Sequence, residues 1–408
     1  MLSRVLLLRL IGIGAGSLAL ASIWALYNVF MPLLLGAFIE SRALRGAIMG
    51  LDNVVAIALI PVVGAWSDRV DGPWGRRLPF LLVGVPLAAL TFAALPWAAA
   101  ALWTLLLVDV VFLLAITLYR APLVALMPDH VAERDRSAAN GVITLMAAVG
   151  GALALLLIAP SFDRAPWLPF AAAAALALIA LAALLAAAQR HPPFVSTGVV
   201  QDDAPLLTVL LRDVRALGRP AQRGALWLLV GLFACFFGFA AVEAQFSVLV
   251  TESLGASGGE AGRMLGLASG AFVLSALPAG LAARRLGALT TMRVGAAVLA
   301  LALLVAFARF DPHVLAVCMA LAGVGWAAVL VPAYPLVAGL GGRERTGFYT
   351  GMYYLFGSGA AIVAPALVGG AMDLLGNPAL LLASALALMV GIAFLSAAGR
   401  HVAAPPGR

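Results

Sequence analysis

The sequence contains no lysine, only two cysteines and few charged residues of any kind. Charged side chains make up 11% of its 408 residues and hydrophobic ones 64%, and the mean hydropathy is +1.09. This composition excludes an ordinary soluble domain, in which about a quarter of the residues are charged. Because lysine is absent, all 25 basic residues are arginines. We read no nucleic-acid site into the basic pI.

The scarcity of cysteine has its own consequence. Cys235 and Cys318 both lie in the middle of apolar runs, where cysteine usually serves as a small packing residue. Two distant cysteines do not make a disulfide framework or the paired spacing of a metal site. We therefore expect no disulfide, no metal and no cofactor.

The sequence is instead rich in long apolar runs. A run of about 20 apolar residues crosses about 30 Å of hydrocarbon as a helix. The sequence predicts an all-α integral membrane protein with twelve such spans. They are expected at residues 10–36, 46–66, 79–98, 101–124, 140–160, 166–188, 224–250, 262–283, 291–308, 313–338, 347–371 and 378–397.

The arginines predict the orientation of these spans. If the N-terminus is cytoplasmic, 19 arginines fall on the cytoplasmic side and 5 on the other, with Arg120 left inside a span. Loops rich in basic residues stay in the cytoplasm, so both termini should be cytoplasmic in a multi-pass protein of the inner membrane. The first apolar run is too long for a signal-peptide core and should remain as the first span. The five exceptions are Arg42, Arg45, Arg164, Arg263 and Arg309.

The chain also repeats itself. Pro122-Leu123-Val124-Ala125 recurs at 335–338, an offset of 213, and the glycine that opens Gly64-Ala65-Trp66-Ser67-Asp68-Arg69 recurs at 280, an offset of 216. Parallel six-helix repeats are the signature of the major facilitator fold. The predicted parts are residues 1–188 and 224–398 as six-helix halves, 189–223 as a cytoplasmic linker with a short interfacial helix, and 399–408 as a cytoplasmic tail.

A tight charged loop follows the second span. Glycines permit the turn, an acid can neutralise a neighbouring helix end, and arginines hold the loop in the cytoplasm. We predict that Asp68 caps a helix of the other half and pairs with arginine when the cytoplasmic side is closed. The residues assigned to this conformational latch are Gly64, Asp68, Arg69, Gly75, Arg76 and Arg77.

The fourth span carries two charges, Asp109 and Arg120, that the second half replaces with alanines. A charge at the centre of a span costs roughly 2.5 to 3.5 kcal/mol, so such residues usually have a function. Eleven residues at about 100° each bring the two within about 20° of one face, which Thr117 shares. Along that face they are about 16 Å apart, too far to pair directly. We expect the face to line a cavity.

Several segments together resemble a known family, the proton-coupled sugar transporters that include the plant sucrose/proton symporters and bacterial glycoside–pentoside–hexuronide cation symporters. The loop from Ser67 through Gly75-Arg76-Arg77-Leu78-Pro79-Phe80 is similar to the family's loop motif. Asp109-Val110 and Arg120-Ala121 are similar to its fourth helix. Further segments that carry the likeness are Trp24-Ala25-Leu26-Tyr27-Asn28, Leu51-Asp52-Asn53, Arg136-Ser137-Ala138-Ala139-Asn140-Gly141, Gly150-Gly151 and Val242-Glu243.

The resemblance implies a proton/sugar symporter that works by alternating access. Asp109 would carry the proton, with Glu243 as a second candidate, and Arg120 would organise the sugar site. Burial disfavours the charged form of a carboxylate, which lets a proton load and leave. Sugars stack on aromatic rings and bond to amides, so further contacts are expected from Trp24, Tyr27, Asn28, Thr117, Gln245 and Trp326. The sugar should be a disaccharide or glycoside, and the protein should act as a monomer in the lipid bilayer.

Three alternatives stay open from the sequence. A sodium-coupled sugar carrier would need paired carboxylates in the second span, whereas Asp52 is followed one turn later by Ala56. A proton-driven drug or metabolite exporter is also possible, because a fold does not fix its substrate. A non-transporting sensor would be expected to carry an added soluble domain.

Overall fold

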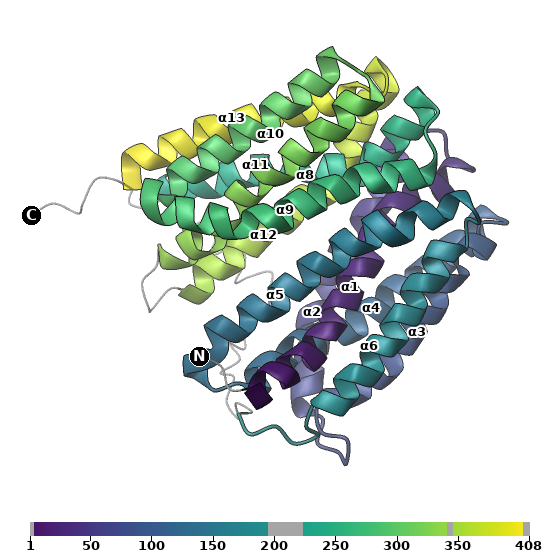
Figure 1. The fold of residues 1–408 in the computed structure, drawn as a ribbon, viewed down its shortest axis with the longest axis vertical. Coiled ribbons are helices and arrows are strands. Elements are labelled where there is room, and N and C mark those ends of the chain that lie inside the picture. The colour runs from purple at the N-terminus through teal and green to yellow at the C-terminus, as the bar shows by residue number, and fades with distance from the viewer. Residues whose placement is uncertain (1–3, 195–222, 341–345, 403–408) are drawn as a thin grey trace, which may run out of the picture. The chain divides into compact units, whose positions relative to one another are not determined.

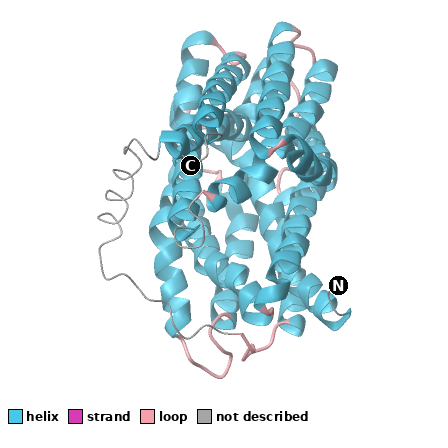
Figure 2. Cartoon of the chain, turned by 90° about the vertical axis from the view of Figure 1, so that its left-hand side faces the viewer, coloured by secondary structure: helices cyan, strands magenta, loops and turns pink. Residues whose placement is uncertain are grey.

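The computed structural model describes residues 4–194, 223–340 and 346–402. Within these ranges the chain is helical, with short connections and no strand (Figure 2). Twelve helices of the described chain are long and apolar enough to cross a membrane, which confirms the predicted fold class. The interfacial helix expected in the linker falls on residues outside these ranges.

The helices of the first half begin and end as follows. Their bounds are α1 Arg4–Gly36, α2 Arg42–Arg69, α3 Leu78–Ala98, α4 Leu102–His130, η1 Glu133–Asp135, α5 Arg136–Leu153, η2 Ala154–Ile158, η3 Ala159–Asp163 and α6 Leu168–Ala187. The fifth span is continuous over Glu133–Asp163 but changes from α through π to 3-10 geometry. Pro160 explains the change, because its nitrogen cannot donate the hydrogen bond that a regular α-helix requires.

The second half has six long helices. Their bounds are α8 Arg223–Leu254, α9 Gly258–Leu286, α10 Ala288–Ala308, α11 Pro312–Gly339, α12 Thr346–Leu375 and α13 Ala379–Val402. Asp311 begins α11 as an N-cap, since its side chain accepts from the backbone nitrogens of His313 and Val314. Gly287, with φ +86°, permits the abrupt turn between α9 and α10.

The described helices group into two compact units. The first contains Met1–Glu40, Leu51–Val199 and Gly255–Ser269, and the second contains Ser41–Gly50, Val200–Leu254 and Gly270–Arg408. The first turns of α2 therefore pack in the second unit, and the first turns of α9 pack in the first unit. Division of the chain into two sequential halves at the linker stays a prediction.

The first unit is built on α1, which packs against α5 and α6, while α3 packs against α4 and α6 (Figure 1). Small residues make the α1–α5 contact close. A side chain at Gly150 would collide with the backbone oxygen of Leu18, and the Ser22 hydroxyl donates to the carbonyl of Gly150 at 2.9 Å. Gly150, the first glycine of the pair noted in the fifth span, is thus a packing site for α1.

The second unit repeats this pattern with its own helices. There α8 packs against α12 and α13, and α10 packs against α11 and α13 (Figure 1). Gly295 and Gly325 allow the close α10–α11 contact, since the backbone of each lies where the side chain of the other would be. We refer below to the loop end of the first unit, where α2 ends and α3 begins, and to the far end of the second unit, where α2 begins.

Candidate functional site

The interior of the first unit holds the charged residues that the sequence singled out. Asp109 on α4 is 2% exposed, and Tyr27 on α1 is fully buried. Their polar groups lie within reach of each other and interact, although the tyrosine hydroxyl makes no hydrogen bond of good geometry with any described residue. One oxygen of Asp109, Oδ1, is equally buried and unpartnered.

An aromatic cluster surrounds this pair. The rings of Trp24 and Tyr27 meet edge to face at 5.4 Å between centroids, and Phe112 contacts Tyr27 at 5.4 Å and Trp24 at 6.2 Å. The indole nitrogen of Trp24 is also buried without a partner among the described residues. Polar atoms of three neighbouring side chains are therefore buried without a hydrogen bond of good geometry among the described residues, whereas buried polar groups are usually well paired.

Two further charges act on this site. Asp52 on α2 is electrostatically coupled both to Asp109 and to Arg120. Its carboxylate accepts hydrogen bonds from the backbone and side-chain nitrogens of Asn53. Arg120 is half-buried and forms no hydrogen bond or ion pair with any described residue. Asp52 thus interacts electrostatically with both Asp109 and Arg120, but none of the three forms an ion pair with another in the described structure.

Apart from the half-buried Arg120, the predicted face of α4 is buried. Leu113, Ile116 and Thr117 are each at most 4% exposed, like Asp109. The Thr117 hydroxyl donates to the carbonyl of Leu113 within the same helix at 2.7 Å. It can still accept a bond from a ligand through its lone pairs. Asn28 lies half-buried one residue after Tyr27 on α1.

Three other predicted substrate or proton contacts, Gln245, Trp326 and Glu243, lie in the second unit, and the first two are engaged in contacts between helices. The side-chain nitrogen of Gln245 on α8 donates to the carbonyls of Arg42 and Pro365, both at 3.0 Å. One face of Trp326 is covered by Phe239, stacked at 4.0 Å between centroids, and Phe236 meets it edge-on. Glu243 is half-buried on α8. Gln245 and Trp326 therefore look like helix-packing residues, and their role as substrate contacts stays a prediction.

The charged loop is held together by Arg77. Its guanidinium pairs with Asp68 at 2.6 Å and with the buried Asp129 at 3.0 Å, and also donates to the hydroxyl of Ser67. Asp68 is 41% exposed at its side chain, whereas Asp129 is 7% exposed. In this structure the partner of Asp68 is therefore the arginine of its own loop. A helix cap made by Asp68 in the other half stays a prediction.

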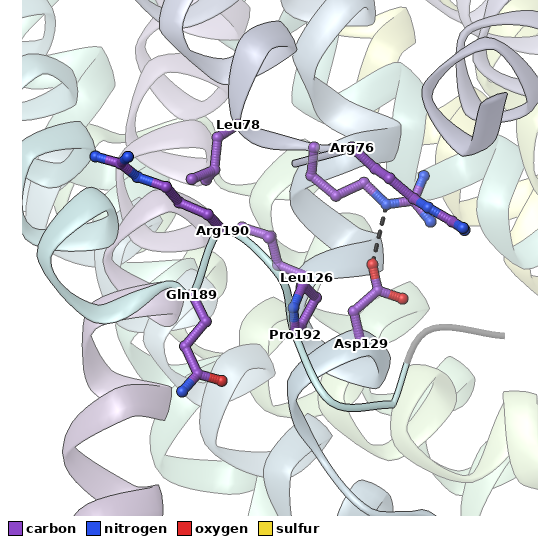
Figure 3. Close-up of a pocket in the computed structure, with 8 residues that line it drawn as sticks. Arg76, Leu78, Leu126, Asp129, Gln189, Arg190 and Pro192 are labelled. Carbon is purple, nitrogen blue, oxygen red and sulfur yellow. Dashed lines mark hydrogen bonds and ion pairs between the residues drawn. The ribbon is translucent and has the colours of Figure 1, made fainter. Parts of the chain in front are cut away.

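The same loop contacts the residues that follow α6. Gly75, with φ +71°, lies against the carbonyl of Arg190, where any side chain would collide, and the Arg190 guanidinium stacks 4.3 Å above the ring of Trp74. His130 accepts a hydrogen bond from the backbone nitrogen of Gln189 at 2.8 Å. A small cleft results (Figure 3). It is lined by Arg76, Arg77, Leu78, Leu126, Asp129, Gln189, Arg190 and Pro192.

Comparison with known proteins decides the family. The model of the Major Facilitator Superfamily matches residues 13–250 and 228–407, almost the whole chain. The chain belongs to the Major Facilitator Superfamily. It is therefore a membrane transporter of this superfamily, as the parallel repeat indicated. No curated protein sequence matches the chain.

Solved structures of transporters share the fold at low sequence identity. The nucleoside transporter NupG matches with a TM-score of 0.72 and 13% identity, over 97% of this chain and 100% of that one. A bacterial homolog of the human lysosomal transporter Spinster matches with 0.73 and 15%, over 98% of each. A POT family peptide transporter matches with 0.71 and 14%, over 96% of each. These likenesses show the fold alone.

Sequence reasoning missed one group of polar residues in this superfamily member. Arg42, Arg45, Glu252 and Asp373 form ion pairs at the far end of the second unit. A signal was present, because Arg42 and Arg45 are two of the five arginines that break the charge rule for loops. Their partners could not be found, since Glu252 and Asp373 are hundreds of residues away in the chain.

Proposed function

We propose that this transporter is a proton-coupled symporter of a sugar, in which Asp109 takes up and releases the proton. One observation carries the proposal: Asp109 Oδ1, the Tyr27 hydroxyl and the Trp24 indole nitrogen, on neighbouring side chains, are buried and make no hydrogen bond of good geometry with any described residue. Leaving a buried polar group unpaired costs about 1 to 3 kcal/mol. A ligand with several hydroxyls would relieve that cost by bonding to all three.

The chemistry of the three atoms fits such a ligand. The indole nitrogen can only donate, the tyrosine hydroxyl can donate and accept, and an ionised carboxylate can only accept. The rings of Trp24, Tyr27 and Phe112 add apolar surface against which a sugar ring can stack. Arg120, unpaired among the described residues, offers a planar fork of donors for two adjacent hydroxyls.

Protonation of Asp109 would couple the two fluxes. When protonated, the acid can donate a hydrogen bond to a sugar hydroxyl, and when ionised it cannot. Sugar affinity then depends on the proton, and by linkage proton affinity depends on the sugar to the same extent. A membrane potential contributes a further 2.3 kcal/mol or so per 100 mV for each charge moved.

We also propose that both termini face the cytoplasm and that the loop end is the cytoplasmic end. The arginine distribution supports this orientation. Two of the five exceptions, Arg42 and Arg45, are neutralised by ion pairs with Glu252 and Asp373. An arginine whose charge is neutralised by an acid adds less net positive charge to its side of the membrane than a free arginine would, so Arg42 and Arg45 count less against the orientation.

Uptake into proteoliposomes tests the proposal. Labelled mono- and disaccharides, glycosides, nucleosides and dipeptides are presented with a pH gradient, with a sodium gradient, or with neither. We expect accumulation of a sugar or glycoside driven by the pH gradient alone. Accumulation that follows only sodium would assign Asp52 and Asp109 to a cation site. Uptake of another substrate class with no sugar uptake would refute the sugar assignment.

A further inference from the structure

A short segment after α6 lies against the loop end of the first unit. We call residues 189–194 the strap. The backbone nitrogen of Phe194 donates to the carbonyl of Asp129 at 3.1 Å, and the guanidinium of Arg190 stacks over the ring of Trp74 at 4.3 Å. The strap therefore contacts both the end of α4 and the loop between α2 and α3 (Figure 3).

A histidine holds the first residue of the strap. Nε2 of His130, the last residue of α4, is 2.8 Å from the backbone nitrogen of Gln189, and its Nδ1 is 2.8 Å from the carbonyl oxygen of Leu126. A backbone N–H can only donate, and a carbonyl can only accept. The imidazole therefore carries its hydrogen on Nδ1 and accepts at Nε2. Both of its hydrogen bonds require the neutral ring.

A second proton on this ring disrupts the contact with the strap. The charged imidazole carries a hydrogen on each nitrogen, so at Nε2 a donor would point at another donor, the backbone N–H of Gln189. The His130 side chain is only 2% exposed, and a buried charge without a partner is costly. Departure of the strap removes the opposing donor and lets water accept from Nε2. The charged ring thus favours an undocked strap.

Charged and titratable groups reach His130 from every element around it. Arg9 repels a positive ring, and Asp129 attracts it. The carboxylate of Asp129 already pairs with Arg77 at 3.0 Å, which weakens its attraction. The last turn of α6 contributes only leucine and alanine. The groups near the ring are Arg9 of α1, Arg77 before α3, Asp129 of α4, Arg136 of α5, and Arg190 and His191 of the strap.

We propose that His130 is a regulatory proton site, separate from Asp109, that holds the strap when neutral and releases it when protonated. Histidine is the side chain whose charge normally changes between about pH 5 and 8. The strap begins the connection between α6 and α8, so the proton controls how much of that connection is held on the first unit. Docking of the strap requires neither a sugar nor the proton carried by Asp109.

The side of the membrane whose pH is sensed rests on the proposed orientation. If the loop end is cytoplasmic, His130 responds to the pH of the cytoplasm. A symporter that imports protons lowers that pH as it works. The site would then report the transporter's own activity back to the connection between its halves.

A distance measurement in the ligand-free protein tests the site. Spin labels are attached through His191→Cys in the strap and Leu107→Cys on α4, in a background with Cys235→Ala and Cys318→Ala. Leu107 is 65% exposed and lies about 34 Å along α4 from His130. The first substitution also removes the strap's own histidine. We expect one narrow 107–191 distance at pH 8, and an undocked population with other distances that rises about tenfold at pH 5.

Two variants at the site should abolish this response. In His130→Gln the side-chain oxygen can accept from Gln189 and the amide nitrogen can donate to Leu126, but the group does not titrate. The strap should stay docked from pH 8 to pH 5. His130→Ala removes the acceptor, so the strap should be undocked at both pH values. Both variants lose the pH dependence, whichever state each one favours.

Asp129→Asn is the matched control, because it removes the other titratable group at the end of α4 and keeps the backbone carbonyl that holds Phe194. Its strap should still be released at acidic pH. Equal 107–191 distances at pH 8 and pH 5 in the protein that retains His130 would overturn the site. A pH response that persists in both His130→Gln and His130→Ala would also overturn it, whatever the uptake panel shows.

Discussion

Asp109 is the residue on which the proposed proton coupling depends. Asparagine keeps its size and can still donate a hydrogen bond, so Asp109→Asn imitates the protonated acid and removes the proton site. We expect the variant to bind sugar at all pH values, whereas the parent binds more weakly as pH rises and the acid ionises. Binding titrations from acidic to alkaline pH measure this difference.

Transport by the same variant separates exchange from accumulation. Exchange of labelled for unlabelled sugar should continue, because it needs no net proton movement. Accumulation should fall to the outside concentration, since no proton remains to drive it. Proton-driven accumulation that persists in Asp109→Asn would falsify the assignment and move the coupling role to Glu243 or Asp52.

Arg120 gives a second prediction at this scale. Lysine keeps the charge but lacks the planar fork that can hold two hydroxyls or a carboxylate. Arg120→Lys should weaken sugar binding about tenfold or more while leaving folding and membrane insertion intact. Binding by calorimetry and size-exclusion profiles in detergent measure the two effects. Affinity within a few-fold of the parent would reassign Arg120 to helix packing.

At this scale the roles of the predicted site residues stay predictions, but the structure shows which side chains already have partners. Asp109 could be singled out from the sequence, because a charge inside a span is costly. The bonds of the Gln245 amide could not be foreseen, since they go to carbonyls of α2 and α12 that only the fold brings near. The sequence shows which side chains are polar, but it does not show which of them are already hydrogen-bonded to other parts of the fold.

At the scale of elements, hydropathy located the helices but not their ends. The first span was predicted from residue 10 and the fourth to residue 124, whereas α1 begins at Arg4 and α4 ends at His130. Hydropathy reports only the part inside the hydrocarbon, and helices continue into the polar region with charged residues. The π and 3-10 turns of the fifth span depend on Pro160 and tertiary packing, and hydropathy does not register them.

The contact between α1 and α5 yields a prediction for these elements. Gly150→Ala places a methyl group against the backbone of Leu18, so the helices must separate. We expect a loss of about 1 to 3 kcal/mol in stability, the usual cost of overpacking. Thermal unfolding in detergent measures this loss.

Gly141 on the same helix is the control, because nothing lies within 4 Å of an added methyl group there. Gly141→Ala should be neutral or stabilising by up to about 1 kcal/mol, since alanine favours the helix. Equal melting temperatures for the two variants would show that α1 and α5 are not tightly packed at Gly150.

For the whole molecule, the repeat predicted the superfamily but not how segments are shared between units. The first turns of α2 and α9 pack in the unit opposite to the one that holds the rest of each helix. Both segments carry glycines at matching positions, Gly46 and Gly50 in α2 and Gly262 and Gly266 in α9, so a shared packing role could have been suspected. The ion pairs of Arg42 and Arg45 with Glu252 and Asp373 could not, because charge complementarity between distant segments leaves no periodic signal.

Asp68 carries the last prediction, which concerns the equilibrium between the states of the whole transporter. In this structure it pairs with Arg77 and remains 41% exposed. If it caps a second-half helix when the loop end is closed, Asp68→Asn weakens that closed state and keeps the loop end open. Sugar binding should be largely retained, because Asp68 lies at the loop end of α2 and the proposed site lies inside the first unit.

Labelling of a cysteine at Gly141 measures this shift. The position is exposed near the loop end of α5, and an added side chain meets nothing within 4 Å. From the cytoplasmic side, an impermeant maleimide should react about threefold faster in Asp68→Asn than in the parent. Asp71→Asn is the matched control, since Asp71 is exposed in the same loop and has no bonded partner among the described residues. If both variants label at the parental rate, Asp68 has no part in closing the loop end, and its pair with Arg77 serves only to fold the loop.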